Sequence, residues 1–514
     1  MSTAAATAAP PPAVDPRVGG RFDDFSDKLS PMLVKELRQG LRAKTFVVVF
    51  LSLQALLAVV LLGAVGANSP EKAGQVVSSV IFLFFSLAVL VVQPLRGIGA
   101  LHNEIKGNTI DLMVLTRLGA WRIVLGKWVA IVSQSALLLT AIAPYLILRY
   151  FFGRMNLFAE LLLLVLVFLG SAVFTAVTVG LSAIGPIIIR GLFPLGMGLL
   201  LIFGIFGIVF DDGLNEMIEF CTLQDKDEVW GLLAALLCGT YLAWTCLALG
   251  ASMIAPMAEN HSTSRRLMAL ATVVLTGILA WAADFQREQA TVMLVLFCVP
   301  ALSIALTESF QLLPPICRPF LKFGALGKVA GRVLYPGWPS GVMFTTLLLA
   351  LGAFVVLVIT PNSHYSAYHM DAQTSITILV FTGTLLLSAV FLRLLSSKVR
   401  QPFTFFILVV VALCVLTIGL GMIADKTEND EFLWLFCWLP PVKFLITDMI
   451  RSEYYAAIHS SGGSYASPDL SPVLVTGLIT NGIYLLTLLT FAFRQFPAIA
   501  RVEEEAENKP ETSP

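Results

Sequence analysis

The sequence has few charged residues, and this scarcity excludes most classes of soluble protein. Only 13% of its 514 residues are charged, whereas a soluble domain carries about 25%. Hydrophobic residues make up 57%, and the mean hydropathy is +0.85. The 33 basic and 33 acidic residues balance, so no net charge attracts nucleic acid. We therefore expect a polytopic membrane protein without a nucleic-acid partner.

The sequence also lacks the motifs of common enzymes and metal sites. It has no Cys-x-x-Cys, no His-Glu-x-x-His and no Gly-x-Ser-x-Gly, so we expect neither a metal site nor catalytic residues. No phosphate-binding Gly-x-x-x-x-Gly-Lys-Ser/Thr loop occurs, and the nearest string, 324–329, has the wrong spacing. We expect no cofactor on this chain, and an ATPase, if one drives the protein, must be a separate polypeptide.

Long apolar runs are the dominant positive feature. A helix needs about 20 apolar residues to cross the hydrocarbon core, and twelve runs meet or nearly meet that length. Because the runs are continuous rather than alternating, they predict helices and not a barrel. The predicted spans are 46–66, 76–95, 124–148, 158–183, 187–210, 229–254, 267–283, 290–308, 340–360, 374–396, 403–424 and 472–493.

The positions of Lys and Arg predict the orientation. With the N-terminus inside, 25 basic residues fall in inner segments and eight in outer ones. Positively charged loops stay on the cytoplasmic side. An even number of spans places both termini on the same side of the membrane. The basic residues predict that this side is cytoplasmic.

The loops follow the same order twice, which predicts two tandem six-helix bundles in an all-α fold. A long basic inner segment follows the second span (96–123) and the eighth (309–339). A longer outer loop precedes the sixth span (211–228) and the twelfth (425–471). The predicted domains are a disordered cytosolic tail 1–29, a first six-span domain 30–256, a second six-span domain 257–495 and a cytosolic tail 496–514. Within 425–471, aromatic residues and a Pro-Pro break predict a helix at the outer leaflet.

Residues 31–44 are predicted to form an amphipathic elbow helix at the inner membrane surface. Ser30 is a good helix cap and Pro31 suits a first turn. Leucines recur every four residues, and basic side chains flank them. A simple basic topology anchor remains the alternative. The basic membrane-interface residues are Lys35, Arg38, Arg42 and Lys44.

Polar residues inside the spans are sparse. Gln54, Gln134 and Asn481 are expected to make helix–helix hydrogen bonds. Glu160 and Glu308 lie near span ends, where a charge can reach water, and Arg393 is expected to extend to the inner surface. Four glycines of the fifth span (Gly196, Gly198, Gly204 and Gly207) either allow close helix approach or merely loosen the packing. No span holds a carboxylate paired with a base, which counts against ion coupling.

One segment carries a family resemblance. The string LVKELRQGLRAKTF precedes the first span, and NEIKGNTIDLMVLTRLGAWRIVLGKWVA follows the second. Together they resemble the permease subunits of type-II ABC exporters, over about 30–131. Asn108 separates the Gly from the Thr of the family pattern, and Arg117 stands where the family has Pro. The matching residues are Glu104, Gly107, Thr109, Asp111, Leu112, Thr116, Leu118, Leu125, Gly126 and Lys127.

The resemblance implies an exporter that moves its substrate across the cytoplasmic (inner) membrane of a bacterium. Segment 104–122 would then dock on a cytosolic ABC ATPase pair, which binds ATP and Mg²⁺. The expected coupling residues are Glu104, Gly107, Thr109, Asp111, Leu112, Thr116, Gly126 and Lys127. Membrane lipids surround the chain, which either supplies both bundles or forms a homodimer. An ion-coupled transporter and a non-transporting membrane scaffold remain the alternative functions, and an enzyme is disfavoured.

Overall fold

The structure is a computed structural model that describes most of the chain. Within the described residues the regular elements are all helical, and no strand occurs among them. Twelve helices in this part of the chain are long and apolar enough to cross a membrane. The predicted all-helical, multi-pass membrane architecture is therefore confirmed. The described ranges are 31–65, 70–107, 119–150, 156–210, 213–256, 259–360, 367–395, 399, 401–427, 431–461 and 468–508.

The first six candidate spans follow the predicted runs, with one large difference at the second. This span continues as helix well beyond 95, to Lys106, so the first residues of the basic inner segment predicted at 96–123 belong to the span. The elements are α3 (Lys44–Val65), α4 (Pro70–Ser86), η1 (Leu87–Val92), α5 (Gln93–Leu95), η2 (Arg96–Gly99), α6 (His102–Lys106), α8 (Ala120–Tyr150), α9 (Leu157–Leu181), η3 (Ile188–Leu192), α10 (Phe193–Phe210) and α12 (Lys226–Ile254).

The last six candidate spans lie within a few residues of their predicted positions. The elements are α13 (Ser262–Ala282), α14 (Arg287–Thr307), α17 (Trp338–Phe354), η4 (Val355–Ile359), α18 (Ala367–Leu394), α19 (Pro402–Thr427) and α21 (Ser471–Phe493). Side-chain caps explain where several spans begin. Asn156 accepts a hydrogen bond from the backbone of Ala159 at the start of α9, and Asp225 forms a capping box with Glu228 at the start of α12.

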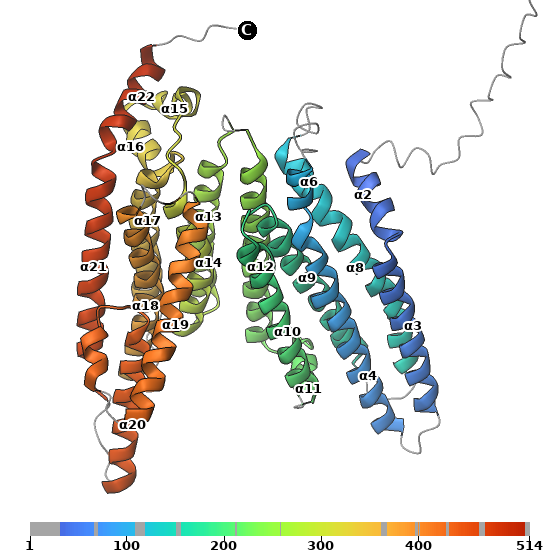
Figure 1. Ribbon diagram of the computed structural model, residues 1–514. Helices are drawn as coiled ribbons and strands as arrows, with labels where there is room; N and C mark the ends of the chain where they lie inside the picture. Colours follow the sequence, from blue (N-terminus) through green and yellow to red (C-terminus); the bar gives the residue numbers. More distant parts are fainter. Residues whose placement is uncertain are drawn as a thin grey trace, which may run out of the picture.

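Shorter helices lie at the two ends of the bundle (Figure 1). One end, which we call the α2 end, carries α2 (Pro31–Leu41), α6, α15 (Pro314–Leu321), α16 (Gly324–Leu334) and α22 (Phe496–Asn508). The opposite end, which we call the α11 end, carries α11 (Gly213–Phe220) and α20 (Val442–Ser461), the latter preceded by η6 (Glu431–Phe436). The predicted helix within 425–471 is therefore present, whereas α11, α15 and α16 were not anticipated.

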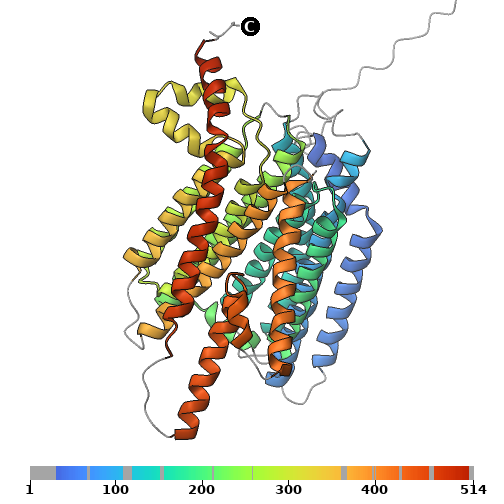
Figure 2. The ribbon, with the colours of Figure 1, turned by 60° about the vertical axis from the view of Figure 1, so that its left-hand side comes forward.

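The last described residues form a packed helix, whereas the sequence predicted only a cytosolic tail at 496–514. Helix α22 packs against α15, and Ile499 and Ala506 are buried with Cys317 and Tyr335. Two ion pairs tie α22 to α16: Arg332 to Glu503 (3.3 Å) and Lys328 to Glu507 (2.8 Å). Figure 2 shows α15 and α16 beside α22, above the spans.

Helices that are close in sequence pack together. Helix α3 packs against α4 and α8, and α9 packs against α8 and α12. In the later part of the chain, α13 packs against α14 and α17, and α18 packs against α14 and α21. Helix α12 contacts α13 and α14, so the two groups of helices adjoin there (Figure 1). Helices α14 and α18 are the most enclosed spans, and apolar residues such as Phe297 and Leu386 form their core.

Candidate functional site

Three segments meet at Lys127 near the α2 end. The Lys127 ammonium group lies 3.1 Å from the Glu36 carboxylate of α2 and 3.2 Å from the Glu104 carboxylate of α6. The Lys127 side chain is only 6% exposed, and both carboxylates are less than one-fifth exposed. We call Glu36, Glu104 and Lys127 the first junction. It connects the elbow helix, the end of the second span and the start of the third.

A second set of contacts lies deeper in the bundle and holds the same elements together. The Gln134 side chain of α8 lies against Gly40 of α2, where a Cβ atom would be 2.2 Å from its amide nitrogen. Arg96 of η2 donates hydrogen bonds to Gln134 and to Gln93, the latter at 2.9 Å. The elbow helix therefore packs along α8, and the expected interhelical role of Gln134 is confirmed.

The structure brings together only part of the predicted coupling set. Glu104 and Lys127 pair directly, and Gly126 is buried beside Lys127 in α8. Gly107 is exposed and ends α6, as its expected turn requires. The predicted coupling residues Thr109, Asp111, Leu112 and Thr116 lie outside the described residues.

The predicted elbow helix is present but ends earlier than expected. Helix α2 stops at Leu41, and Lys44 already begins α3. The four basic side chains predicted at the interface, Lys35, Arg38, Arg42 and Lys44, are all exposed. Glu36 was not predicted as a site residue. It is the single acidic residue of the basic 30–44 segment, and this isolated negative charge could have indicated a buried ion pair.

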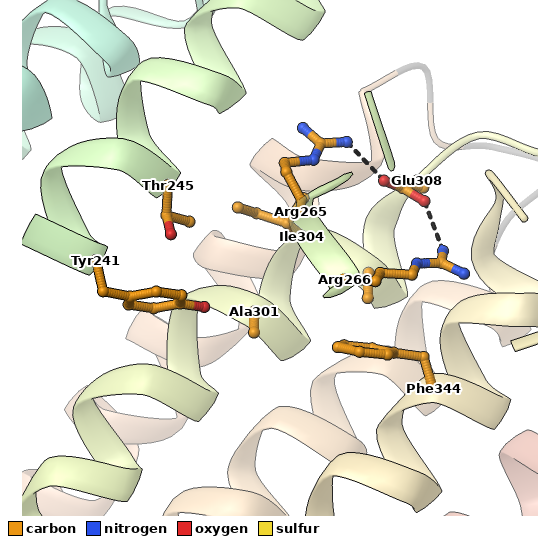
Figure 3. A pocket seen from close by; sticks show the side chains of 9 residues that line it. Tyr241, Thr245, Arg265, Arg266, Ala301, Ile304, Glu308 and Phe344 are labelled. Atoms are coloured by element: carbon orange, nitrogen blue, oxygen red, sulfur yellow. Dashed lines mark hydrogen bonds and ion pairs between the residues drawn. The ribbon is translucent and has the colours of Figure 1, made fainter. Parts of the chain in front are cut away.

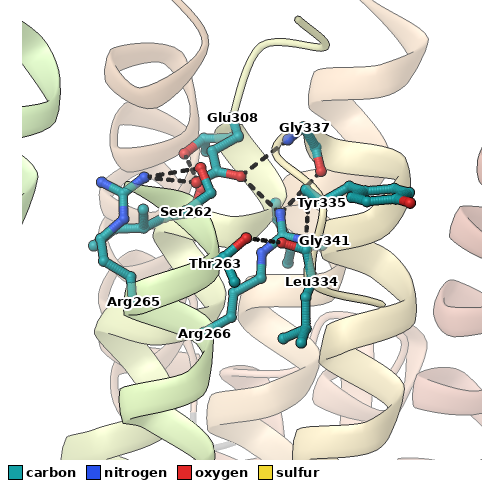
Figure 4. Close-up of polar contacts among 12 residues, drawn as sticks. Ser262, Thr263, Arg265, Arg266, Glu308, Leu334, Tyr335, Gly337 and Gly341 are labelled. Atoms are coloured by element: carbon teal, nitrogen blue, oxygen red, sulfur yellow. Dashed lines mark hydrogen bonds and ion pairs between the residues drawn. The ribbon is translucent and has the colours of Figure 1, made fainter. Parts of the chain in front are cut away.

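A comparable junction occurs in the later part of the chain (Figure 4). Glu308 follows the last residue of α14, and its two carboxylate oxygens pair with Arg265 (2.6 Å) and Arg266 (2.7 Å) of α13. Arg266 also donates to the carbonyl oxygens of Tyr335 (2.6 Å) and Gly337 (3.0 Å). We call Arg265, Arg266 and Glu308 the second junction.

Glycine is required at the start of α17 for this geometry. Gly337 has φ of +112°, a conformation that residues with a side chain rarely adopt, and its backbone N–H donates to Glu308 at 3.1 Å. At Gly341 a Cβ atom would lie 2.1 Å from the carbonyl oxygen of Ala305. These two glycines let α17 approach α14 and the second junction closely.

The side chains of the second junction are largely buried, with 3–13% of their surface exposed. Burial alone would raise the pKa of Glu308, but the guanidinium groups of Arg266 and Arg265 more than offset it, so its pKa lies below the usual range. The space between the junction, Tyr241 and Phe344 has a volume of about 10 Å³, room for roughly one water molecule (Figure 3). No substrate fits in this space, but Arg265 and Glu308 also line a pocket of about 330 Å³ beside α12.

The two junctions involve corresponding spans of the first and second halves of the chain. Each lies at the α2 end, and each has a glutamate where a candidate span ends: Glu104 in the last turn of the second span and Glu308 directly after the eighth. Each also involves the start of the next span, at Lys127 in α8 and at Gly337 before α17. The position of the cation differs, because it lies on the third span in the first junction and on the seventh in the second.

Several expectations about polar span residues are settled by the structure. Gln54 donates to Ala141 of α8 (3.4 Å) and Asn481 to Leu379 of α18 (2.8 Å), which confirms their interhelical hydrogen bonds. Glu160 was expected to reach water, which is wrong, because it is 2% exposed. Arg393 does not simply extend to the surface, since it stacks on Trp338 at 4.2 Å.

The glycines of the fifth span mostly do not mediate close packing. A Cβ atom at Gly196, Gly204 or Gly207 would meet nothing within 4 Å, and only Gly198 adjoins Leu95 and Val91. The close approach occurs instead between α9 and α12. There a Cβ atom on Gly180 would lie 2.2 Å from the carbonyl oxygen of Cys246.

No known protein family, curated protein or solved structure matches this chain.

Proposed function

We propose that the chain is the membrane-spanning permease subunit of an ATP-driven ABC exporter. A separate ABC ATPase pair binds ATP and Mg²⁺ at the α2 end, which we take to be cytoplasmic. The substrate crosses the cytoplasmic membrane of a bacterium, among membrane lipids. The chain contributes no phosphate-binding loop, so all the hydrolysis belongs to the partner.

The first junction is the observation that carries this proposal. The resemblance to type-II ABC exporters assigns ATPase docking to the segment after the second span. Glu104 lies in the last turn of that span, and through Lys127 it is tied to both the elbow helix and the third span. A force applied to the docking segment is therefore transmitted to three elements at once. Because buried ion pairs are costly to break, these elements would move together.

The helix packing supports the proposal that one chain supplies two six-helix bundles. The contacts α3–α4, α3–α8, α8–α12 and α9–α12 correspond to α13–α14, α13–α17, α17–α21 and α18–α21. Each member of the second set lies six spans after its counterpart. Glu104 and Glu308 also occupy corresponding places. A homodimer through the first halves remains the alternative arrangement.

The distribution of buried charge favours an external energy source over ion coupling. Among the described residues, the buried charged side chains are Lys127, Glu160, Arg266, Lys443 and Glu503. None lies in the middle third of a candidate span. A proton or sodium relay needs titratable groups at that depth. A carrier driven by ion gradients is therefore less consistent with the described residues than one driven by an ATPase.

Copurification with variants of the first junction tests the proposal. We expect a Walker-motif ATPase to copurify with the chain from its native membrane, and to be lost with Glu104→Ala. Asn103→Ala is the matched control, because Asn103 lies in the same short helix but is exposed, outside the junction and before the docking segment 104–122. Membrane levels of all three proteins are compared by immunoblot. Transport by the purified chain without any ATPase would contradict the proposal.

A non-transporting scaffold gives a different result in the same system. It would retain the ATPase on copurification, but vesicles containing both proteins would not accumulate any tested substrate on addition of ATP. The exporter requires both partner binding and ATP-dependent accumulation.

A further inference from the structure

A large cavity lies among four spans of the later part of the chain. It has a volume of about 530 Å³ and is lined by α14, α17 with η4, α18 and α21. Helices α17 and α18 each pack against both α14 and α21, so the four surround the space. Cavities of about 300–1,000 Å³ are typical of small-molecule sites. Neither junction borders this cavity, so its role is separate from theirs.

The lining is apolar, and none of the described residues that form it is charged. Leucine is its commonest side chain, and its polar members are Ser375, Thr382 and Asn481. Asn481 donates hydrogen bonds to the carbonyl oxygen of Leu379 (2.8 Å) and to the hydroxyl of Thr382 (3.2 Å). Its amide oxygen lies against Gly383, where a Cβ atom would be 2.2 Å from it. An apolar space of this kind stays dry and takes up apolar molecules.

The most exposed residues of the lining lie within candidate spans. Leu357 of η4 and Leu478 of α21 are each 62% exposed, and Phe381 of α18 is 41% exposed. Apolar side chains that are exposed along a span face the hydrocarbon of the bilayer. The cavity therefore borders the bilayer, and a molecule dissolved in the hydrocarbon can reach it.

The cavity is displaced towards the α11 end, where α18 and α21 begin (Figure 1). Its lining starts at Ser375 and Leu474, close to the beginning of these two spans. It extends only to Leu386 and Leu485, well before the same spans finish at the α2 end. A chain that enters the cavity would therefore come from the leaflet at the α11 end.

Two glycines widen the cavity. Gly352 of α17 and Gly482 of α21 both line it, and a Cβ atom at either position would meet nothing within 4 Å. Glycine weakens the interior of a helix. Close helix packing, which requires glycine at Gly180 and Gly341, does not require it here. Larger side chains at Gly352 and Gly482 would instead occupy free space.

We propose that this cavity holds one hydrocarbon chain of a membrane lipid, whose head group lies at the α11 end. A hydrocarbon chain suits the apolar lining and reaches it through the bilayer. A head group does not fit inside, because its charge would be buried without a partner. A protein segment fits less well than a lipid chain, since its backbone polar groups would find no hydrogen-bond partners in such a lining.

Photocrosslinking of the full-length chain in phosphatidylcholine vesicles tests the site. The probe is a phosphatidylcholine with a diazirine midway along one acyl chain, and crosslinked residues are identified by peptide mass spectrometry. We expect crosslinks to Val299 of α14 and Ile378 of α18, which line the cavity, and to the lipid-facing Leu486. Gly482→Leu should lose the cavity crosslinks and keep those at Leu486. Gly204→Leu is the matched control, because a Cβ atom at this glycine of α10 also meets nothing within 4 Å, and it should keep all of them.

A second variant and two further probes sharpen the test. Gly352→Leu fills the cavity from α17 and should act as Gly482→Leu does, so the proposal is testable even if one variant folds poorly. A diazirine near the carboxyl end of the acyl chain should crosslink Leu474, and one near the methyl end should crosslink Leu485. The reverse order, no crosslink to the cavity residues of α14 and α18, or undiminished crosslinks in both variants would overturn the proposal. Since the assay needs no ATPase, its outcome is independent of the exporter proposal.

Discussion

At the residue scale, a single buried lysine couples three segments that are far apart in sequence. Lys127 binds Glu36, 91 positions away, and Glu104, 23 positions away. Removing the ammonium leaves two carboxylates close together and poorly exposed, which is costly. The energetic role of Lys127 is therefore larger than that of a surface ion pair.

We predict that Lys127→Met destabilises the protein by about 1–3 kcal/mol, since it leaves partly buried charges unpaired. A double-mutant cycle with Glu104→Gln should give a coupling energy of about 0.5–3 kcal/mol. Unfolding is followed by tryptophan fluorescence in detergent. The exposed Arg122, in the first turn of α8, provides the control Arg122→Met, which should change stability by less than about 0.5 kcal/mol. Strict additivity of the Lys127 and Glu104 effects would show that the pair does not interact.

The second junction predicts a loss of stability in acid. The pKa of Glu308 is lowered in the folded protein, so its contribution is complete above the unfolded value of about 4.3 and is lost as the pH falls through the lower folded pKa. Thermal melts between pH 7 and pH 3 should show the wild-type Tm falling more steeply at the acid end than that of Glu308→Gln. Parallel curves would mean that Glu308 does not titrate as an ion-paired group.

At the element scale, α9 and α12 approach each other closely, and this approach depends on glycine. Gly180→Ala would place a methyl group 2.2 Å from the backbone carbonyl oxygen of Cys246, so one helix must move. We predict a destabilisation of about 1–3 kcal/mol. Gly204→Ala in α10 meets nothing within 4 Å and gains helix propensity, so it should be neutral or stabilising by up to about 1 kcal/mol. Equal thermal stability of the two variants would contradict this packing.

The spans could be predicted from sequence because hydropathy is a local property. The run 472–493 differs by one residue from α21, and 187–210 by one from η3 with α10. Short helices outside the apolar layer were missed because they depend on tertiary partners: α15 and α22 bury Cys317 and Ile499 against each other. The partners of Lys127 were missed for the same reason, although Lys127 and Glu104 were each singled out by the family resemblance.

At the scale of the whole molecule, the α2 and α11 ends should lie on opposite sides of the membrane. Phe323, between α15 and α16, and Glu216 of α11 are both exposed, and these helices lie at opposite ends (Figure 1). In a cysteine-free background, a membrane-impermeant maleimide should label Glu216→Cys in intact cells and Phe323→Cys only in inverted vesicles. The reverse pattern would contradict the orientation that the basic residues predict.

The central proposal is that this chain is the membrane-spanning subunit of an exporter and that its ATPase is a separate protein. Native mass spectrometry of the complex, extracted gently from its own membrane, tests this claim most directly. The account predicts the 55.6 kDa chain together with two copies of a Walker-motif ATPase, which dissociate when Glu104 is replaced by Ala. A population containing only this chain, singly or as a dimer, would contradict it.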